Sequence, residues 1–418
     1  IEIGMGKRTN TILQSAFFAL ANIMPTEDAV RYMKEAAKKS YSKKGDAVVE
    51  MNYKAIDAGK DAIHKVEVPA SWADAVDNSE KPVLEGRPAT IKMVQEIMEP
   101  VAKMDGDSLP VSAFVDHVDG QFEQGASAYE KRGVAVTVPE WHPENCIQCN
   151  QCAFVCPHAT IRAFAMDKDE VAKAPEALKS VKMNGKGCEE YQFSIAISPL
   201  DCMGCGVCAK VCPMASKENK ALVMVPQESQ AAQQDVFNYA VNNVTKKENM
   251  PAETTVKGSQ FNQPLLEFSG SCAGCAETSY ARLITQLFGE RMFISNATGC
   301  SSIWGGPAAT SPYTVNKVSG FGPAWANSLF EDNAEHGFGM YLGQKAVRDM
   351  LISQVKALRE TTESEDMKAA IDAYLNTLDD GKANGPAARA LIAELEKDPE
   401  NEYSKVILPK KSYLEIGR

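Results

Sequence analysis

Two runs of cysteine with one spacing constrain the fold of this chain more than any other feature of its sequence. Each run reads C-x₂-C-x₂-C-x₃-C-P, and the runs end at Pro157 and at Pro213. Three close-spaced thiolates can hold three corners of one iron–sulfur cube, while the fourth thiolate, one helical turn further on, ligates a different cube. The two runs are therefore expected to fold against each other, because each lends a ligand to the other's cluster.

This spacing is the signature of bacterial two-cluster ferredoxins, and it predicts two [4Fe–4S] sites with interchanged fourth ligands. The first thiol set is Cys146, Cys149, Cys152 and Cys212, and the second thiol set is Cys202, Cys205, Cys208 and Cys156. Electron transfer is the function that follows most directly from this pattern.

Structural zinc is the alternative interpretation of CxxC pairs, but a Cys₄ zinc site needs only two pairs with a spacer. Here each run has four cysteines, and small or apolar residues such as Ala153, Val155 and Val207 lie beside them, which suits a dry cluster pocket. Iron–sulfur chemistry is therefore favoured over zinc. Disulfides are disfavoured, because neighbouring thiols in a chain with no signal peptide indicate a reducing compartment, the cytoplasm.

Charge and hydropathy argue against two classes of partner. The 418 residues carry a net charge of −11, which disfavours nucleic acid. No run approaches the ~18 apolar residues that a membrane span requires. The first residues contain neither a basic leader nor an initiator methionine, so the chain is expected to begin inside a longer one.

The expected fold class is multidomain, α/β and α+β, in five successive parts. In the first part, apolar residues such as Leu13, Phe17 and Leu20 recur at helical spacing, and they predict core-facing helices beginning near Thr11, Pro25 and Asp46. The parts are 1–85, the end of an α/β domain; 86–137, a Pro-punctuated connecting arm; 138–226, the two-[4Fe–4S] ferredoxin-like domain; 227–262, a polar linker; and 263–418, the start of another α/β domain.

Local patterns place some elements within these parts. Alternation predicts a short strand at Ser194–Ile197, a second short strand is expected at Met292–Ser295, and apolar stripes predict helices over residues 343–408. The Lys-, Glu- and Ala-rich insertion 167–186 separates the two cysteine runs, and it is expected to pack on a neighbouring domain.

A third group of cysteines lies in the last part. Cys272 and Cys275 form a CxxC pair, and Cys300 follows the strand predicted at 292–295. Taken alone, this third thiol set is consistent with zinc, a redox pair or plain burial. Beside two iron–sulfur sites, a third cube is the more natural interpretation. Its fourth ligand is then either Cys188, which is favoured as an isolated thiol, or a residue beyond the chain.

Several motifs together resemble pyruvate:ferredoxin (flavodoxin) oxidoreductases. They are Cys272-Ala-Gly-Cys-Ala-Glu-Thr278, Gln286-Leu-Phe-Gly-Glu-Arg-Met-Phe293, Asn296-Ala-Thr-Gly-Cys-Ser-Ser-Ile-Trp-Gly305 and Gly322-Pro-Ala-Trp-Ala-Asn-Ser-Leu-Phe-Glu-Asp332. The likeness extends to Gly4-Met-Gly-Lys-Arg-Thr-Asn10 and to Tyr129-Glu-Lys-Arg-Gly133, so it covers nearly the whole chain.

The resemblance implies a thiamine diphosphate-dependent, homodimeric enzyme that converts pyruvate and coenzyme A to acetyl-CoA and CO₂. Electrons would pass through three [4Fe–4S] clusters to ferredoxin or flavodoxin. This chain would be the central segment of that enzyme and would work with its remaining segments. Residues 1–85 would end a gamma-type α/β oxidoreductase domain, and residues 263–418 would begin the thiamine diphosphate domain and carry a helical insertion.

The resemblance also assigns site residues. The third thiol set, Cys272, Cys275 and Cys300, would hold the cluster nearest the thiamine, with a fourth ligand outside this chain. The residues implied to line the thiamine cofactor are Glu277, Thr298, Gly299, Cys300 and Phe330. No side chain of this chain is expected to act as a catalytic acid or base.

One departure from the family pattern limits what the chain is expected to do alone. The Gly-Asp-Gly motif with a downstream Asn, which holds Mg²⁺ and the diphosphate in thiamine enzymes, is missing from the sequence. The Mg²⁺ ligands are therefore expected outside this chain, which alone would be an incomplete enzyme. Three alternatives stay open: a non-catalytic electron-transfer module, an oxidoreductase for another 2-oxoacid, and a zinc-stabilised interaction protein.

Overall fold

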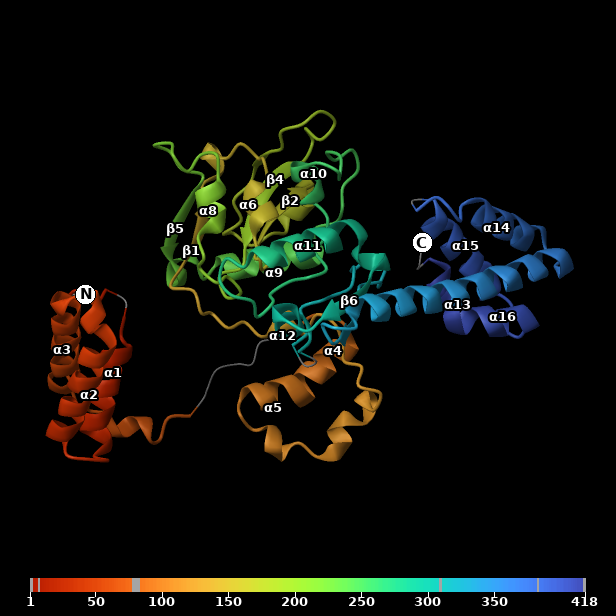
Figure 1. Ribbon diagram of the computed structural model, residues 1–418. Coiled ribbons are helices and arrows are strands. Elements are labelled where there is room, and N and C mark those ends of the chain that lie inside the picture. Colours follow the sequence, from red (N-terminus) through yellow and green to blue (C-terminus); the bar gives the residue numbers. More distant parts are fainter. Residues whose placement is uncertain (1–2, 7, 77–82, 308–309, 382, 416–418) are drawn as a thin grey trace. The chain divides into compact units, whose positions relative to one another are not determined.

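The computed structural model describes residues 3–6, 8–76, 83–307, 310–381 and 383–415 (Figure 1). The chain divides into two compact units, Ile1–Pro82 and Val83–Arg418, and each is described by itself. Across the described ranges, no helix is both long and apolar enough to cross a bilayer.

Three helices make up most of the first unit, as the apolar spacing predicts. They are α1 (Asn10–Ala21), α2 (Thr26–Tyr41) and α3 (Asp46–Asp61). The contact between α1 and α3 uses small residues: the Ser15 hydroxyl donates to the carbonyl of Ile56 over 2.5 Å, and Gly59 lies against the backbone of α1.

The apolar stripe of α1 was expected to be core, and that expectation is wrong. Leu13, Phe17 and Leu20 are 63%, 53% and 68% exposed. The helix meets α3 through the face that carries Ser15, so the larger apolar side chains point away from the contact.

The segment 86–137, expected to be a connecting arm, is helical and has a small core of its own. Helix α4 (Pro88–Met93) continues through a π-helical turn, Val94–Met98, into α5 (Glu99–Ala102). Buried side chains of this helix pack with Ala126. Short 3₁₀ turns follow at Gly106–Ser108, Val111–His117 and Ala126–Tyr129.

Two small antiparallel sheets support the cysteine loops. In one, β1 (Thr137–Trp141) pairs with β5 (Leu222–Pro226), so that Trp141 lies opposite Leu222. In the other, β4 (Gln192–Ile197) lies between β2 (Ile161–Met166) and β3 (Val181–Lys182). The strand predicted at 194–197 is thus confirmed as part of β4.

One short helix follows each cysteine loop. Helix α6 (Gln151–Val155) carries Cys152, and α8 (Val207–Val211) carries Cys208. The two helices contact each other, which brings the two cysteine runs together as their shared ligands require.

The insertion 167–186 and the segment 227–262 both belong to this domain. Helix α7 (Lys168–Ala172) and β3 arise from the insertion, which was expected to pack on a neighbouring domain. Helix α9 (Gln233–Asn243) lies where a linker was expected, and its Phe237 packs with Ala196 of β4. Because most residues of α9 are polar, the sequence did not indicate that this helix has a buried face.

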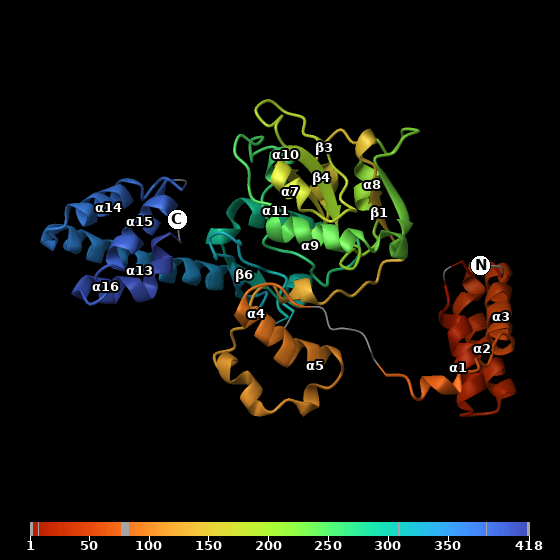
Figure 2. The ribbon, with the colours of Figure 1, turned by 180° about the vertical axis from the view of Figure 1, so that it is seen from behind.

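The last part begins with an α/β unit and ends in a helical one (Figure 2). Helix α11 (Ala276–Phe288) leads to β6 (Phe293–Ala297), and β7 (Ala324–Ser328) pairs with β6 in parallel after α12 (Cys300–Gly305). The strand predicted at 292–295 is confirmed with a shift of one to two residues.

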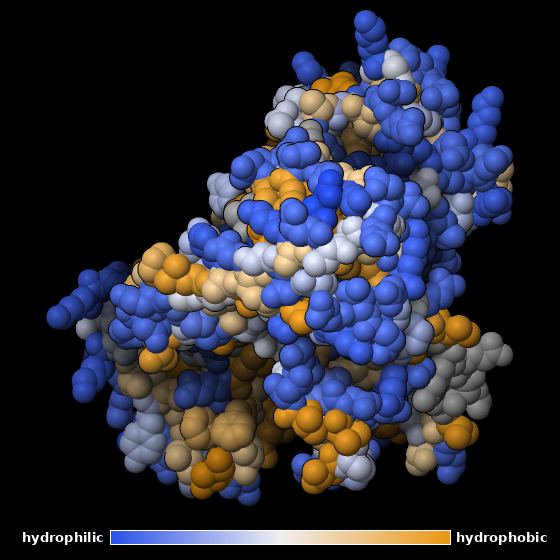
Figure 3. All heavy atoms as spheres, turned by 90° about the vertical axis from the view of Figure 1, so that its right-hand side faces the viewer, coloured by the Kyte–Doolittle hydropathy of each residue, from blue (hydrophilic) through white to orange (hydrophobic). Residues whose placement is uncertain are grey.

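Four helices form a separate apolar core at the end of the chain, as the stripes over 343–408 predict. They are α13 (Asn333–Thr361), α14 (Glu365–Asn376), α15 (Asn384–Leu395) and α16 (Glu402–Ile407). Leu351, Val355 and Leu358 of α13 are buried in this core. The start of α13 exposes Phe338 and Tyr341, and Figure 3 shows such apolar groups scattered among polar ones on the visible face.

The remaining short elements connect these parts. They are 3₁₀ helices at Ser42–Lys44, Ala70–Trp72, Pro143–Asn145, Gln227–Gln230, Gly289–Arg291 and Leu408–Leu414, and the single-turn helix α10 (Val256–Ser259).

Candidate metal centre

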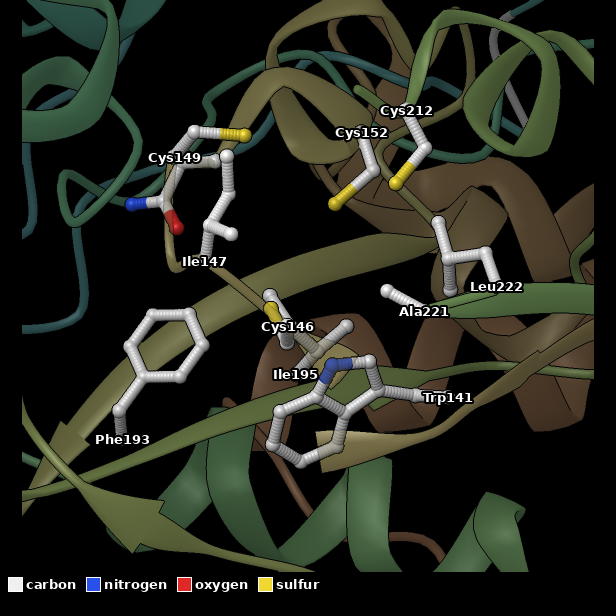
Figure 4. A pocket seen from close by; sticks show the side chains of 11 residues that line it. Trp141, Cys146, Ile147, Cys149, Cys152, Phe193, Ile195, Cys212, Ala221 and Leu222 are labelled. Atoms are coloured by element: carbon white, nitrogen blue, oxygen red, sulfur yellow. The ribbon is translucent and has the colours of Figure 1, made fainter. Parts of the chain in front are cut away.

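The first thiol set surrounds one hollow of the ferredoxin-like core. Cys146, Cys149, Cys152 and Cys212 all line a pocket whose other walls include Trp141 and the apolar side chains Phe193, Ile195 and Leu222 (Figure 4). Three of the thiols come from the first run, and Cys212 comes from the end of α8. The structure therefore brings together the four residues that the spacing groups, including the ligand crossed over from the second run.

Each cysteine loop reaches its shape through two residues in the left-handed region. In the second run these are Gly204 and Gly206, with φ of 67° and 70°, where glycine is free of Cβ strain. The matching positions of the first run are Gln148 and Asn150, with φ of 57° and 61°. Both loops therefore have the same backbone conformation. In the first run it is adopted by residues with a Cβ, so other contacts are needed to stabilise it.

Side-chain hydrogen bonds provide that support. The Gln148 amide donates to the carbonyl of Lys182 (2.8 Å) and accepts from the backbone N–H of Asn184 (2.7 Å). The Asn150 amide donates to the carbonyl of Lys257 (2.9 Å). The insertion and the segment expected to be a linker therefore hold the first cysteine loop in place.

Hydrogen-bond donors point at the sulfur atoms. The backbone N–H of Gln148 donates to Sγ of Cys146, and that of Gly204 donates to Sγ of Cys202, each over 3.4 Å. Among the described residues, the buried Nε1 of Trp141 has no acceptor within ordinary hydrogen-bond geometry (Figure 4). It lies beside the sulfur of Cys146, whose pKa burial raises and the Trp141 N–H partly lowers. Donors of this kind stabilise charge on cluster sulfur, so the orphaned indole N–H fits a bound cluster.

The second thiol set is also assembled. Burial raises the pKa of Cys208, and the neighbouring charges of Cys156, Cys202 and Cys205 raise it further. Burial likewise raises the pKa of Cys202 to about 12, with smaller contributions from Cys156 and Cys205. Cys156 therefore lies with the cysteines of the second run, although it belongs in sequence to the first.

Buried thiols of this kind are suited to binding iron and are shielded from reactions with solutes in the solvent. Burial also raises the pKa of Cys152 far above its ordinary value, and that of Cys146 to a lesser extent. Thiolates in such a pocket need a cation to replace their protons, and iron–sulfur clusters are held by cysteine thiolates in this way. In the part of the chain that the structure describes, no three His, Cys, Asp or Glu side chains converge on a point suited to a single metal ion.

The CxxC pair of the third thiol set lies against the second thiol set. A Cβ built on Gly274, between Cys272 and Cys275, would lie 3.6 Å from the Cβ of Cys205. The preceding residues are fixed there too, because the N–H of Phe268 donates to the carbonyl of His158 over 3.0 Å. The structure thus places two cysteine loops side by side that are far apart in sequence.

The remaining cysteines differ in their surroundings. Cys300 is exposed at the start of α12, and among the described residues it does not come together with Cys272 and Cys275 in a group of three metal ligands. Cys188 is 1% exposed in the core of the ferredoxin-like domain, beside Met183 and Phe193.

Lys131 and Arg132, just before Gly133, contact residues beside two of the cysteine loops. Neither was singled out from the sequence as a site residue. Lys131 forms an ion pair with Asp201 (2.5 Å), directly before Cys202. Arg132 donates to the carbonyl of Ser269 (3.4 Å), close to Cys272. His158 is buried beside them, donates from Nδ1 to the same Ser269 carbonyl over 3.2 Å, and has its pKa lowered by burial.

Most residues implied to line the thiamine cofactor gather at one edge of the β6–β7 sheet. Thr298, Gly299 and Cys300 follow β6, and Phe330 follows β7, so all four lie at the carboxyl ends of parallel strands. The Thr298 hydroxyl donates to the carbonyl of Ser328 over 3.0 Å and so joins the two strand ends. Glu277 lies in the first turn of α11, near enough to Tyr313 for its charge to raise the pKa of that phenol, which burial raises more.

Comparison with known proteins gives two family models. A domain of unknown function matches residues 77–135, and a 4Fe-4S dicluster domain matches residues 145–216. The second model covers both cysteine runs, and the first ends just after Lys131 and Arg132.

Curated relatives match nearly the whole chain. It is 48% identical over 396 residues to the pyruvate:ferredoxin oxidoreductase of Moorella thermoacetica and 48% identical over 399 residues to the pyruvate-flavodoxin oxidoreductase of Klebsiella pneumoniae. These alignments cover 94% and 96% of this chain but 33% of each relative. The mitochondrial pyruvate dehydrogenase [NADP(+)] of Euglena gracilis is 45% identical over 365 residues, which are 85% of this chain and 19% of that protein.

The chain spans about a third of the length of the first two relatives. By sequence, nearly the whole chain therefore matches a segment of pyruvate:ferredoxin and pyruvate-flavodoxin oxidoreductases, and it contains a 4Fe-4S dicluster, ferredoxin-like domain.

Proposed function

We propose that this chain is the electron-relay segment of a pyruvate:ferredoxin or pyruvate-flavodoxin oxidoreductase. The whole enzyme would convert pyruvate and coenzyme A to acetyl-CoA and CO₂ in the cytoplasm, as a homodimer. Three [4Fe–4S] clusters, one for each thiol set, would carry single electrons to ferredoxin or flavodoxin.

The observation that carries this proposal is the order of the three cysteine loops in space. The CxxC loop around Gly274 lies against Cys205 of the second thiol set, and the second set shares the α6–α8 contact with the first. A relay needs such a continuous series of neighbouring centres. An electron entering at the third set would pass through the second set and leave from the first.

The thiamine side of the proposal rests on the edge of the β6–β7 sheet. Thiamine diphosphate, when bound, supplies an electron sink at the carbon that loses CO₂. Thr298, Gly299 and Phe330 would contribute to the wall of its site, since ligands bind at the carboxyl ends of parallel strands. Cys300 stands in the same loop, so one loop would serve both the thiamine and the third cluster. Residues outside this chain would supply Mg²⁺ ligands and a fourth cluster ligand.

The first unit fits the proposed end of a gamma-type α/β domain. Its helix α1 presents Leu13, Phe17 and Leu20 to solvent, whereas helices of α/β domains normally cover a sheet with such a face.

The test is the iron and acid-labile sulfide content of the anaerobically purified protein, with EPR of its reduced form. About eight irons per chain are expected for the two complete thiol sets, and about twelve when a fourth ligand completes the third set, since each cube holds four irons. Zinc in place of iron would reject the proposal. Two clusters without pyruvate-dependent reduction in the complete enzyme would leave an electron-transfer module, and reduction by another 2-oxoacid alone would replace pyruvate as the substrate.

A further inference from the structure

Arg282 carries a charge that the protein around it does not neutralise. The side chain is 2% exposed and lies in the middle of α11. All its hydrogen-bond acceptors are uncharged. They are the carbonyls of Cys156 (3.0 Å from Nε) and Phe154 (from Nη2), and the amide oxygens of Gln260 (2.9 Å from Nη1) and Gln286 (2.6 Å from Nη1).

Two other buried cations of the described residues have carboxylate partners, whereas Arg348, 7% exposed, donates to the amide oxygen of Asn384. Arg162 forms an ion pair with Glu267, and Lys247 forms ion pairs with Asp167 and Glu170. None of the ion pairs found among the described residues includes Arg282. A buried guanidinium without a counter-charge costs several kcal/mol of stability, so buried charges in proteins are normally paired.

A source of negative charge beside Arg282 is the second thiol set. Arg282 donates to the backbone of Cys156, and the charge of the Cys156 thiolate acts on the guanidinium. Burial lowers the pKa of Arg282 to about 10, while Cys156 opposes that change, and the side chain stays protonated at neutral pH. A [4Fe–4S] cube with four thiolate ligands bears a net negative charge that grows by one unit on reduction.

We infer that Arg282 is the buried counter-charge of the cluster held by Cys156, Cys202, Cys205 and Cys208, and that it raises the reduction potential of this cluster. The inference rests on the proposed function, because it requires a cluster in the second thiol set. A fixed positive charge stabilises the more negative, reduced cluster more than the oxidised one. Arg282 is a positioning residue of the relay, since it acts on the cluster and not on a substrate.

The position of Arg282 gives this charge a role in electron flow. The residue lies in the middle of α11, the helix that begins directly after the CxxC pair of the third thiol set. Its side chain donates to the carbonyl of Phe154 near the end of α6. A raised reduction potential of the cluster in the second set would favour electron transfer to it from the third set. The CxxC pair of the third set directly precedes α11, the helix that carries Arg282. The hydrogen bonds to Phe154 and Cys156 fix the distance from guanidinium to cluster.

Two substitutions test the charge in different ways. Arg282→Gln removes it. Gln260→Glu keeps Arg282 in place and puts a carboxylate where the amide oxygen now accepts from Nη1, and the hydroxyl of Ser259, 3.0 Å from the Gln260 amide nitrogen, can donate to the new oxygen. In EPR-monitored redox titrations of the anaerobically purified protein, both variants are expected to lower one cluster midpoint. A tenfold loss in the relative stability of the reduced form corresponds to a shift of about 59 mV for one electron.

Two further variants separate charge from packing. Gln286→Met removes an acceptor of the same guanidinium at similar volume and leaves the charge, and Arg282→Lys retains a cation. Both are expected to keep midpoints close to those of the wild type. If Arg282→Gln does not fold, Gln260→Glu against Gln286→Met still decides.

The possible results are distinguishable. The inference is overturned if iron-loaded Gln260→Glu or Arg282→Gln protein keeps both midpoints, or if Gln286→Met lowers a midpoint equally. A wild-type protein without iron–sulfur signals would reject the proposed function, and this inference with it, which the iron content reports before any titration.

Discussion

The left-handed residues of the two cysteine loops decide how the thiols are presented. Gly204 and Gly206 take this conformation without strain, whereas Gln148 and Asn150 have side chains that bond to Lys182, Asn184 and Lys257. The first loop is thus tied to surrounding segments by the side chains of its left-handed residues, whereas the glycines at these positions of the second loop have no side chain to form such bonds. Residues that never touch iron therefore shape one of the two sites.

The interchange of fourth ligands leads to a prediction at Cys156. Cys156→Ala should remove one ligand of the second thiol set and lower the iron content by up to about four per chain, the content of one cube. Iron and sulfide analysis with EPR is the measurement. A [3Fe–4S] signal in place of a [4Fe–4S] signal would also agree.

Cys188→Ala is the matched control, because Cys188 is buried in the same core but stands apart from both runs in the sequence. Its iron content should equal that of the wild type. Equal iron loss in both variants would show that general damage to the core, and not ligand loss, explains the Cys156 result.

The sequence predicts the ligands better than it predicts their supports. The spacing groups Cys156 with the second run and Cys212 with the first run, and the structure brings these thiols together. Their role as cluster ligands stays a prediction. Trp141, Gln148 and Arg282 carry no such local signal. Their roles depend on segments up to 128 residues away in sequence, as in the hydrogen bond from Arg282 to Phe154.

Among the elements, α1 and α3 make the closest helix contact of the first unit. A Cβ added at Gly59 would lie 2.3 Å from the carbonyl oxygen of Ile12 and 2.8 Å from the Cβ of Ser15. Gly59→Ala should therefore push the helices apart and destabilise this unit by about 1–3 kcal/mol, as overpacking does. Hydrogen exchange of the α1 and α3 amides would report the loss.

Gly343→Ala is the control for that change. Gly343 is an exposed residue within α13, and a Cβ there would meet nothing within 4 Å. Here alanine should slow exchange slightly, because it favours a helix by about 0.5–1 kcal/mol over glycine. Faster exchange in α13 would contradict the steric explanation for Gly59.

Helix α7 depends on a lysine from the segment expected to be a linker. Lys247 is nearly buried and lies 3.0 Å from Asp167 and 2.6 Å from Glu170, the two residues of the capping box of α7. Lys247→Met should destabilise this region by about 1–3 kcal/mol, because it leaves two carboxylates without their cation. Hydrogen exchange of α7 and β3 would measure it.

The adjacent lysine provides the comparison. Lys246 pairs with Glu253 at the surface, where its side chain is 61% exposed. Lys246→Met should change stability by less than about 1 kcal/mol. Similar losses for both lysines would mean that burial of the Lys247 pair does not matter.

These elements also mark where sequence patterns fail. The stripes over 343–408 correctly predict a helical core, since Leu351, Val355 and Leu358 of α13 are buried against the other helices of the same bundle. The stripe of α1 has the same spacing but is exposed, because periodicity predicts a helix without naming what covers it. Helix α9 was missed because Phe237 is buried among mostly polar neighbours in sequence.

On the scale of the whole molecule, cluster chemistry is confined to one unit. All twelve cysteines lie between Cys146 and Cys300, inside Val83–Arg418. The first unit has no thiol to contribute. Residues 1–82 therefore supply no thiol ligand to a cluster.

Removal of residues 1–82 should therefore leave iron and sulfide per chain unchanged. The deletion is expected to keep both EPR signals of the ferredoxin-like domain, because every residue shown to support its loops lies after residue 82. Loss of either cluster on deletion would mean that the first unit stabilises the second.

The crossed placement of Cys156 and Cys212 has a consequence for the replacement of a damaged iron–sulfur cluster. A cluster in either thiol set would join both halves of the domain, so replacing one damaged cluster would also disturb the other site. Loss of the damaged cluster would free a cysteine that also anchors the backbone leading to the other cluster, and α6 and α8 would lose the tie between them. Two clusters that share ligands in this way would therefore be expected to assemble together and to be lost together on exposure to oxygen.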